Sequence, residues 1–238
     1  MVRIEVCVES TSGAKTAALG GADRIELCAA LELGGITPSA GLIEAVVDVI
    51  TTHVLIRPRG GDFCYDKHEI RVMAKDVEHA IDRGAESVAI GALTADGRVD
   101  MDAMVRLLGA AGEVPVTFHR AFDSVVDPFA ALDDLMELGV DRLLTSGCAQ
   151  TAAEGAEAIA EFVRRCGDDL CVMPGSGVAP DNAAALILST GAREIHCSAK
   201  SPVVGSAPLV KVGPHDGGQR FETDLGRVRA IVTAVSEL

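Results

Sequence analysis

Three things are scarce in this sequence: long apolar runs, a leader-like beginning, and basic residues. No apolar run is long and uninterrupted enough to span a bilayer, so we expect no membrane insertion. The formal net charge is -14, with Lys+Arg 21 against Asp+Glu 35. This charge argues against nucleic acid and anionic membrane as partners, because both attract basic surfaces. The first residues, MVRIEVCVES, lack the pattern of a secretory signal, and a cytoplasmic location is therefore expected.

Cys-x-x-Cys pairs are also absent, although the chain has seven cysteines. An odd number of scattered thiols without paired spacing is typical of reduced cysteines rather than of a disulfide framework. Most of these side chains are expected to be small, ordinary core residues.

Neither a Gly-x-Gly-x-x-Gly motif after the first predicted strand nor a Pro/Ser-rich linker is present. The missing linker indicates one domain over residues 1–238. The missing motif argues against a doubly wound dinucleotide-binding sheet, the main alternative architecture. Short β-rich runs alternate with amphipathic helical segments along the chain. Eight such units in 238 residues match the size of a single TIM-like (β/α)8 barrel.

The boundaries follow from the apolar periodicity and from the glycines between segments. The predicted strands cover Arg3–Glu9, Asp23–Ala29, His53–Arg59, Ser87–Leu93, Pro115–Phe122, Arg142–Gly147, Leu170–Gly175 and Arg193–Ala199. The predicted helices cover Gly13–Leu19, Ser39–Thr51, Lys67–Arg83, Asp100–Ala111, Pro128–Leu138, Ala152–Arg165, Pro180–Ser189 and Asp224–Leu238. Four helix ends carry a glycine, which readily takes the positive φ of a helix stop: Gly20, Gly84, Gly139 and Gly191. The segment 201–221 is predicted to be a long loop, either a lid or partly disordered, which makes the last unit irregular.

Alternation along each strand sorts side chains between the helix-facing side and the lumen of the barrel. Apolar residues such as Ile4, Val6 and Val8 belong against the helices, so the residues between them point inward. Applied to five strands, the rule gathers charged side chains, histidines and thiols in one lumen. The inward set is Glu5, Cys7, Glu9, Glu26, Cys28, Arg57, Arg59, Thr117, His119, Glu194, His196 and Ser198. Structural ion pairing explains part of it, but charges at the carboxyl ends of barrel strands favour a functional pocket.

The stretch His53–Tyr65, HVLIRPRGGDFCY, has the composition of an anion-binding strand end. Arg57 and Arg59 share one face, where two guanidiniums repel each other unless an anion lies between them, and Asp62 adds a carboxylate at the rim. The alternative is that nearby glutamates neutralise both arginines. Hydroxyl and backbone N–H groups after the sixth and seventh strands are further candidate anion donors. These candidates are Ser146, Gly147, Gly175, Ser176 and Gly177.

Five stretches match a known family pattern. They are Glu26-Leu27-Cys28, Gly34-Gly35-Ile36-Thr37-Pro38-Ser39, Ile56-Arg57-Pro58-Arg59-Gly60-Gly61-Asp62-Phe63, Phe118-His119-Arg120-Ala121-Phe122-Asp123 and Leu144-Thr145-Ser146-Gly147. With them the sequence resembles the copper homeostasis protein CutC family, from near the N-terminus to about Ser198. It departs from the pattern at Pro174-Gly175-Ser176-Gly177, where Ala-Gly-x-Gly is frequent, and at Cys197, where serine is usual. The resemblance implies a TIM-like barrel, a cytosolic location, a homo-oligomer (dimer or tetramer) and a role in copper handling.

Copper homeostasis is the first function we expect. Reduced copper is a soft ion that favours thiolate ligands and also accepts imidazole. Cys7 and Cys28 are predicted to lie inward on adjacent strands at similar depth, and His119 or His196 could assist them. The alternative for each cysteine is a small core residue.

The second function we consider is an enzyme acting on a small anionic metabolite, for example a phosphorylated one. Arg57 and Arg59 would clamp the anion, since planar guanidiniums bind such groups bidentately. Glu9, Glu26 and His119 are the candidates for general acid and base catalysis, although His119 also suits a satisfied core position. The remaining predicted pocket residues are Glu5, Asp62, Arg120, Asp123, His196 and Ser198, with Asp123 orienting Arg120 or capping a helix.

Overall fold

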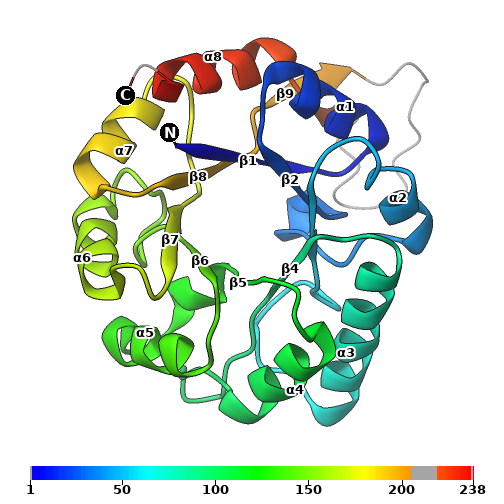
Figure 1. The fold of residues 1–238 in the computed structure, drawn as a ribbon, viewed down its shortest axis with the longest axis vertical. Coiled ribbons are helices and arrows are strands. Elements are labelled where there is room, and N and C mark those ends of the chain that lie inside the picture. Colours follow the sequence, from blue (N-terminus) through cyan, green and yellow to red (C-terminus); the bar gives the residue numbers. More distant parts are fainter. Residues whose placement is uncertain (1, 205–218, 237) are drawn as a thin grey trace.

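The computed structural model describes residues 2–204, 219–236 and 238. Within them, parallel strands form a ring that is surrounded by helices (Figure 1). The strands are β1 Arg3–Val8, β2 Arg24–Leu27, β3 Thr52–Leu55, β4 Ser87–Ile90, β5 Val116–Phe118, β6 Arg142–Thr145, β7 Cys171–Pro174 and β8 Glu194–Cys197. Their order is β7-β6-β5-β4-β3-β2-β1-β8, and β7 and β8 lie side by side without ladder pairing. The predicted TIM-like barrel is thus confirmed as a nearly closed barrel.

Side-chain caps and glycines set the helix ends. Asp66 and Glu69 form a reciprocal capping box at the start of α3, and Asp127 caps α5 ahead of Pro128. Among the predicted helix stops, Gly84, Gly139 and Gly191 have positive φ, and at the first joint Gly21 takes this role. The helices are α1 Thr11–Gly20, α2 Ala40–Glu44, α3 Lys67–Asp82, α4 Met101–Ala111, α5 Pro128–Glu137, α6 Ala156–Cys166, α7 Ala183–Thr190 and α8 Leu225–Ser236, with 3-10 turns η1 Leu31–Leu33 and η2 Arg120–Ser124.

The main core lies between the strands and the helices. Its residues include Ile4, Val6 and Val8 of β1, as the alternation predicted. On the other side of the strands a second, smaller apolar cluster forms inside the barrel, from Cys7, Cys28, Leu55 and Ala89. The parallel registers Cys7 to Glu26 and Glu5 to His196 bring inward side chains of β2 and β8 beside those of β1. The sheet therefore fixes which polar side chains meet in the lumen.

All eight predicted strands extend beyond the carboxyl ends of the observed ones, the fifth into what is η2, and the second predicted helix is also too long. The third strand ends at Leu55 rather than Arg59, and after it the backbone of Arg57 bonds with Thr37 instead of continuing the ladder. The helix predicted over Ser39–Thr51 ends at Glu44 and gives way to turns. The residues that follow Glu44 are rich in β-branched valine and isoleucine, which form helices poorly.

The segment 201–221 is not entirely a loop. Its ends belong to β9 (Lys200–Val204) and β10 (Gln219–Thr223), which pair antiparallel with Pro202 opposite Phe221. The long-loop prediction is wrong for these ends, because the two segments run antiparallel and their backbone groups pair as in a β-hairpin. The rest of the predicted loop, residues 205–218, lies outside the described part of the chain.

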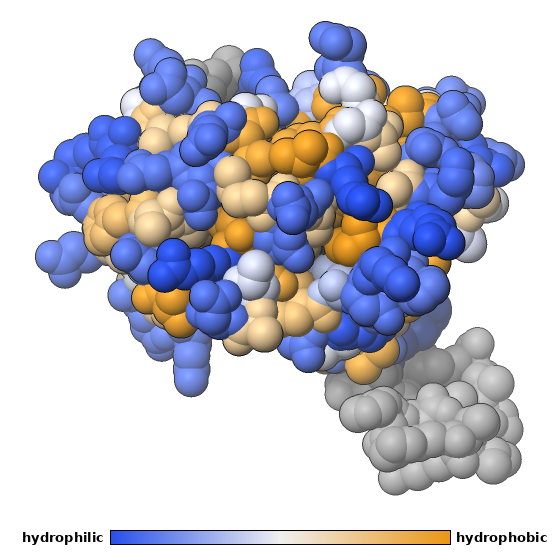
Figure 2. All heavy atoms as spheres, turned by 90° about the horizontal axis from the view of Figure 1, so that it is seen from below, coloured by the Kyte–Doolittle hydropathy of each residue, from blue (hydrophilic) through white to orange (hydrophobic). Residues whose placement is uncertain are grey.

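The described helices include none that is long and apolar enough to cross a membrane. Figure 2 shows one side of the molecule, on which hydrophilic residues lie among apolar ones. The most exposed large apolar side chains are Leu19 of α1, Leu188 of α7 and Val126, which belong to separate parts of the fold. Single exposed apolar residues of this kind are normal on protein surfaces and carry no functional meaning alone.

Candidate functional site

A cavity of about 580 Å³ opens at the carboxyl ends of the barrel strands. Active sites of TIM barrels lie at this end, because the loops that follow the strands converge there. The polar lining includes predicted residues from four different strand ends: Glu26, His119, Ser176 and His196. The cavity size is within the range of roughly 300–1,000 Å³ that is typical of small-molecule sites.

Below the cavity, a buried ion-pair network centres on Glu5. Arg24 donates from Nε to Glu5 (2.6 Å), and Nδ1 of both His196 (2.8 Å) and His53 (2.9 Å) lies close to the same carboxylate. Arg24 also contacts Glu194. Burial alone would raise the pKa of Glu5, but its hydrogen bond with His196, the adjacent imidazole of His53 and the charge of Arg24 hold that pKa well below the ordinary value. Glu5 is therefore an anion that organises the floor of the cavity.

Three members of this network were missed in the sequence. Arg24 and His53 are buried, and Arg142 donates to Glu194 over 2.6 Å. Arg24 precedes Glu26 by two residues, and His53 precedes Arg57 by four, so both share the inward parity of residues that were identified. The same alternation rule could have found them.

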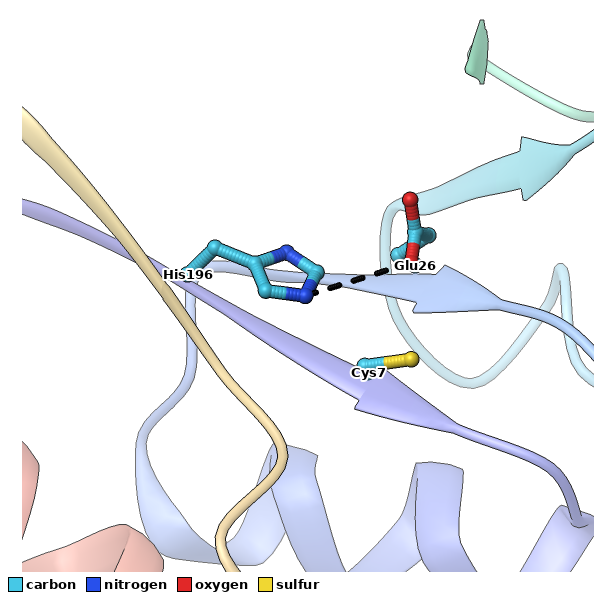
Figure 3. Close-up of side chains that lie close together, drawn as sticks. All are labelled: Cys7, Glu26 and His196. Carbon is cyan, nitrogen blue, oxygen red and sulfur yellow. Dashed lines mark ion pairs between the residues drawn. The ribbon is translucent and has the colours of Figure 1, made fainter. Parts of the chain in front are cut away.

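Potential soft-metal ligands meet on β1, β2 and β8. One donor atom each of Cys7, Glu26 and His196 lies within 4.8 Å of the others, and Figure 3 shows the three side chains together. The Nε2 atom of His196 is 3.9 Å from Glu26, while its Nδ1 atom faces Glu5. Next to this cluster, the Sγ atoms of Cys7 and Cys28 are 3.6 Å apart. The predicted two-sulfur neighbourhood is thus present.

The electrostatics of this cluster depend on its burial. The neighbouring Cys28 thiol, burial and the Glu26 carboxyl together raise the pKa of the Cys7 thiol well above its ordinary value. Burial likewise raises the pKa of Glu26. Burial would lower the pKa of His196, but its bond with Glu5 and the charge of Glu26 outweigh this and raise it. Without a bound cation, the thiol therefore keeps its proton.

Arg57 and Arg59, predicted as a pair, have different surroundings. Arg57 is buried, lines the cavity, and donates only to backbone oxygens: those of Leu33, Gly35 and Gly61. Arg59 lies outside the cavity lining and is half-exposed. Its guanidinium donates to Glu69 (2.5 Å) and Asp62 (3.1 Å), and these two carboxylates neutralise it.

Two further predicted acids, Asp62 of the rim and inward Glu9, are also outside the cavity lining. Asp62 is exposed, and its carboxylate accepts from the backbone of Cys64 as well as from Arg59. Glu9 accepts the backbone N–H of Leu31 (2.7 Å) and so fixes the start of η1. Among the predicted acid and base candidates, only Glu26 and His119 line the cavity.

His119 is the buried polar residue at the end of β5, with 4% of its surface exposed. Its Nδ1 atom accepts the backbone N–H of Ala121 (3.2 Å), so the proton of the neutral ring is on Nε2. Burial and the nearby charge of Arg57 lower its pKa to about 3. His119 is consequently a neutral hydrogen-bond donor at neutral pH, rather than a ready general acid.

This pKa predicts a pH-dependent stability. An unfolded histidine has a pKa near 6.5 and His119 in the folded chain about 3, so between these values only the unfolded chain takes up the proton and acid destabilises the fold. Relative to a His119→Gln variant, wild-type protein should lose about 2 kcal/mol of unfolding free energy between pH ~6.5 and ~4.5. Urea denaturation across this range measures the difference. Parallel pH profiles for the two proteins would contradict it.

The Asp123 carboxylate of η2 accepts hydrogen bonds from the polar groups of the loop after β6. It accepts from the backbone and hydroxyl groups of Ser146, from the Thr145 hydroxyl, and from Arg120 Nε at 2.8 Å. The Gly147 N–H donates to Thr145 Oγ1. Of the predicted anion donors, Ser146 therefore already serves an internal carboxylate and Gly147 a neighbouring hydroxyl. Arg120, which pairs with Asp123, lines the cavity.

The loop after β7 is different. Gly175 is buried and its N–H bonds to the Thr145 backbone, but Ser176 and Gly177 line the cavity together with Ser198 beyond β8. Ser176 has a positive φ of 78°, a conformation that is uncommon for residues with a side chain. Such backbone is found preferentially at functional sites.

Comparison with known proteins places these features in a family. The model of the CutC family matches residues 2–201. The "family protein CutC" of Xanthomonas campestris pv. campestris (strain 8004) is 45% identical over 236 residues, which cover 96% of this chain and 97% of that one. The Homo sapiens "Copper homeostasis protein cutC homolog" is 46% identical over 200 residues, which cover 83% of this chain and 73% of that one.

Solved structures agree. The crystal structure of the putative copper homeostasis protein CutC from Streptococcus agalactiae has a TM-score of 0.80 and 31% identity, covering 83% of this chain and 99% of that one. A thiamine phosphate pyrophosphorylase from Pyrococcus furiosus has a TM-score of 0.63 but 16% identity over 99% of this chain and 96% of that one, so it shows the fold alone. The family match and the close relatives extend over most of the barrel, and the chain therefore belongs to the CutC family.

Proposed function

We propose that this protein takes part in copper homeostasis by binding Cu(I) at Cys7 and Cys28, with His196 as the third ligand. The single observation that carries the proposal is the 3.6 Å separation of the two reduced Sγ atoms beside an imidazole nitrogen. Thiolate and imidazole donors suit a soft ion. The names of the human and Streptococcus relatives, which refer to copper homeostasis, support the same biological role.

The orientation of His196 gives further support. Glu5 occupies its Nδ1 side at 2.8 Å and leaves Nε2 directed toward Cys7 and Glu26 (Figure 3). A carboxylate that holds one nitrogen of a ligating histidine orients the ring and increases its basicity. Cys7 also lines the cavity, so an ion could reach the site from the open end of the barrel.

Binding would be linked to proton release. Burial and the neighbouring thiol keep Cys7 protonated, and a thiol binds metal as the thiolate. The ion would therefore displace the thiol protons, and its affinity would rise with pH. Glu26 belongs to the same cluster, but two thiolates already exceed the single positive charge of Cu(I), and carboxylates are poor ligands for this ion.

Anaerobic titration of the reduced protein with Cu(I) against a competing chelator tests the proposal. We expect one tightly bound ion, and at least about 100-fold weaker binding in Cys7→Ser and in Cys28→Ser, since even indirect partners of a metal ligand contribute 10–100-fold. Cys148→Ser is the matched control, because this thiol is exposed and far along the sequence from the cluster. Affinity that is unchanged in both lumenal variants would exclude the site. Preference for Zn(II) over Cu(I) would exclude copper as its ion.

A further inference from the structure

The cavity is cationic although the chain is strongly acidic. Among the described residues that line it, Arg57, Arg120, Lys200 and Arg227 carry positive side chains, and Glu26 is the one carboxylate. The whole chain has Lys+Arg 21 against Asp+Glu 35. This local reversal of charge sign requires an explanation. Binding of Cu(I) does not supply one, because positive side chains repel a cation.

Arg57 is the most informative of these positive side chains. It is 6% exposed, and in the described part of the chain no carboxylate lies within ion-pair distance of its guanidinium. Three backbone oxygens satisfy part of its hydrogen-bonding capacity, but its Nε has no acceptor there. A buried charge without a counter-charge is costly. The carbonyls hold the guanidinium in place and leave its charge available to a ligand.

His119, which also lines the cavity, adds a second unsatisfied donor. Its Nε2, which carries the ring proton, is buried and has no hydrogen-bond partner in the described residues. The Phe63 ring connects the two side chains, with its centroid 4.8 Å from the Arg57 guanidinium carbon and 5.2 Å from the His119 ring. One cation and one neutral N–H donor, fixed against the same aromatic ring, form a site suited to a carboxylate.

A separate set of donors follows β7. The backbone N–H groups of Ser176, Gly177 and Val178 have no acceptor in the described residues, and all three residues line the cavity. In the order β7-β6-β5-β4-β3-β2-β1-β8, three strands separate β3 from β7 in either direction around the ring. Arg57, which follows β3, and the 176–178 amides therefore lie on opposite sides of the barrel mouth. Clustered backbone amides are suited to phosphate oxygens.

We propose that the cavity binds a small organic molecule with an anionic group at each end, a carboxylate held by Arg57 and His119 and a phosphate held by the amides of residues 176–178. Such a ligand would extend across the mouth and cover Glu26 and His196. A failure of this anion site would leave the copper proposal standing, since neither set of donors includes Cys7, Cys28 or His196.

Calorimetric titration of the metal-free, reduced protein with three probes of one carbon skeleton tests this. They are 3-phosphoglycerate, glycerol 3-phosphate and glycerate, which carry both anionic groups, only phosphate, and only carboxylate. We expect 3-phosphoglycerate to bind at least about tenfold more tightly than either of the others, because each end contributes its own charged hydrogen bonds. No advantage of the doubly anionic probe would overturn the proposal, and binding of glycerate but not glycerol 3-phosphate would overturn its phosphate half.

Arg57→Gln and Arg59→Gln provide matched variants. We expect Arg57→Gln to weaken 3-phosphoglycerate by about 10-fold to 100-fold while glycerol 3-phosphate changes by less than about twofold, since charged hydrogen bonds are lost at one end only. Arg59→Gln should change neither, because Glu69 and Asp62 already neutralise Arg59 outside the cavity. If the glutamine variant folds poorly, Arg57→Lys repeats the test, because it keeps the charge but removes the planar guanidinium that binds a carboxylate bidentately. Equal effects of substitutions at 57 and 59 would contradict the assignment.

Discussion

Replacing Arg24 with methionine is expected to lower the unfolding free energy by about 3–5 kcal/mol, the usual result of removing one partner from a buried ion pair. Arg24 is 4% exposed and lies between two buried carboxylates, Glu5 and Glu194. Without Arg24, the partners that remain to Glu5 are His53 and His196, and Glu194 still pairs with Arg142. A loss of this size is a large fraction of the roughly 5–15 kcal/mol by which domains are stable.

Urea denaturation measures this loss, with Arg193→Met as the matched control. Arg193 pairs with Asp168 at the surface, and such exposed pairs contribute only about 0–1 kcal/mol. Adding Glu5→Gln to Arg24→Met should restore part of the stability, because it removes the buried carboxylate that is left without an arginine partner. If Arg24→Met were no more harmful than Arg193→Met, the network would contribute little to stability.

The same variant should change the acid response. The pKa values of Glu5 and Glu194 are lowered in the folded protein despite burial, which by itself raises them. Carboxylates of this kind contribute stability above their unfolded pKa, near 4.5, and lose it as the pH falls through the folded value. Arg24→Met removes much of that contribution. The gap between the two proteins should therefore narrow below about pH 4.5.

Alternation along strands was sufficient to predict most of the lumen. Glu5, Cys7, Glu26, Cys28 and His196 were all identified from parity, and they meet in the structure because parallel registers align β1 with β2 and β8. Both rules are local: one depends on the pleat of a single strand and the other on its immediate neighbours. For this reason the position of the site was accessible from the sequence.

The hydrogen-bond partners of Arg57 and Arg59 could not be predicted in the same way. Parity applies only while a strand continues, and β3 ends at Leu55, before either arginine. Beyond that point each side chain takes the partners of an irregular loop, carbonyls for Arg57 and Glu69 for Arg59. Glu69 is on α3, ten residues further along the chain. Such a contact depends on how loop and helix pack in three dimensions.

The loop after β6 gives a second example. Ser146 was predicted to offer its groups to a ligand, but the short turn η2 folds back and places Asp123 against them. Hydrogen bonds that Asp123 accepts from Thr145, Ser146 and Cys148 keep the loop closed. A sequence pattern cannot tell whether an N–H cluster binds an external anion or one supplied by the chain itself.

A Gly155→Ala substitution should expose how tightly this loop is packed. Gly155 precedes α6, and a Cβ atom there would lie 1.9 Å from the Ser146 carbonyl oxygen and 2.9 Å from its carbon. Both are backbone atoms, so no rotamer change relieves the clash and the loop must move. We expect the unfolding free energy to fall by at least about 3 kcal/mol, the upper part of the range for overpacked interiors.

Gly109→Ala is the matched control for this substitution. Gly109 lies in α4, where an added Cβ meets nothing within 4 Å, and alanine there should stabilise the helix by about 0.5–1 kcal/mol. Two identical changes of glycine to alanine are thus expected to have opposite signs in the same urea denaturation experiment. A neutral Gly155→Ala would mean that the backbone around Ser146 yields without loss. In that case Asp123 would not hold the loop rigidly, and Arg120, which the same carboxylate positions at the cavity, would lose its fixed orientation as well.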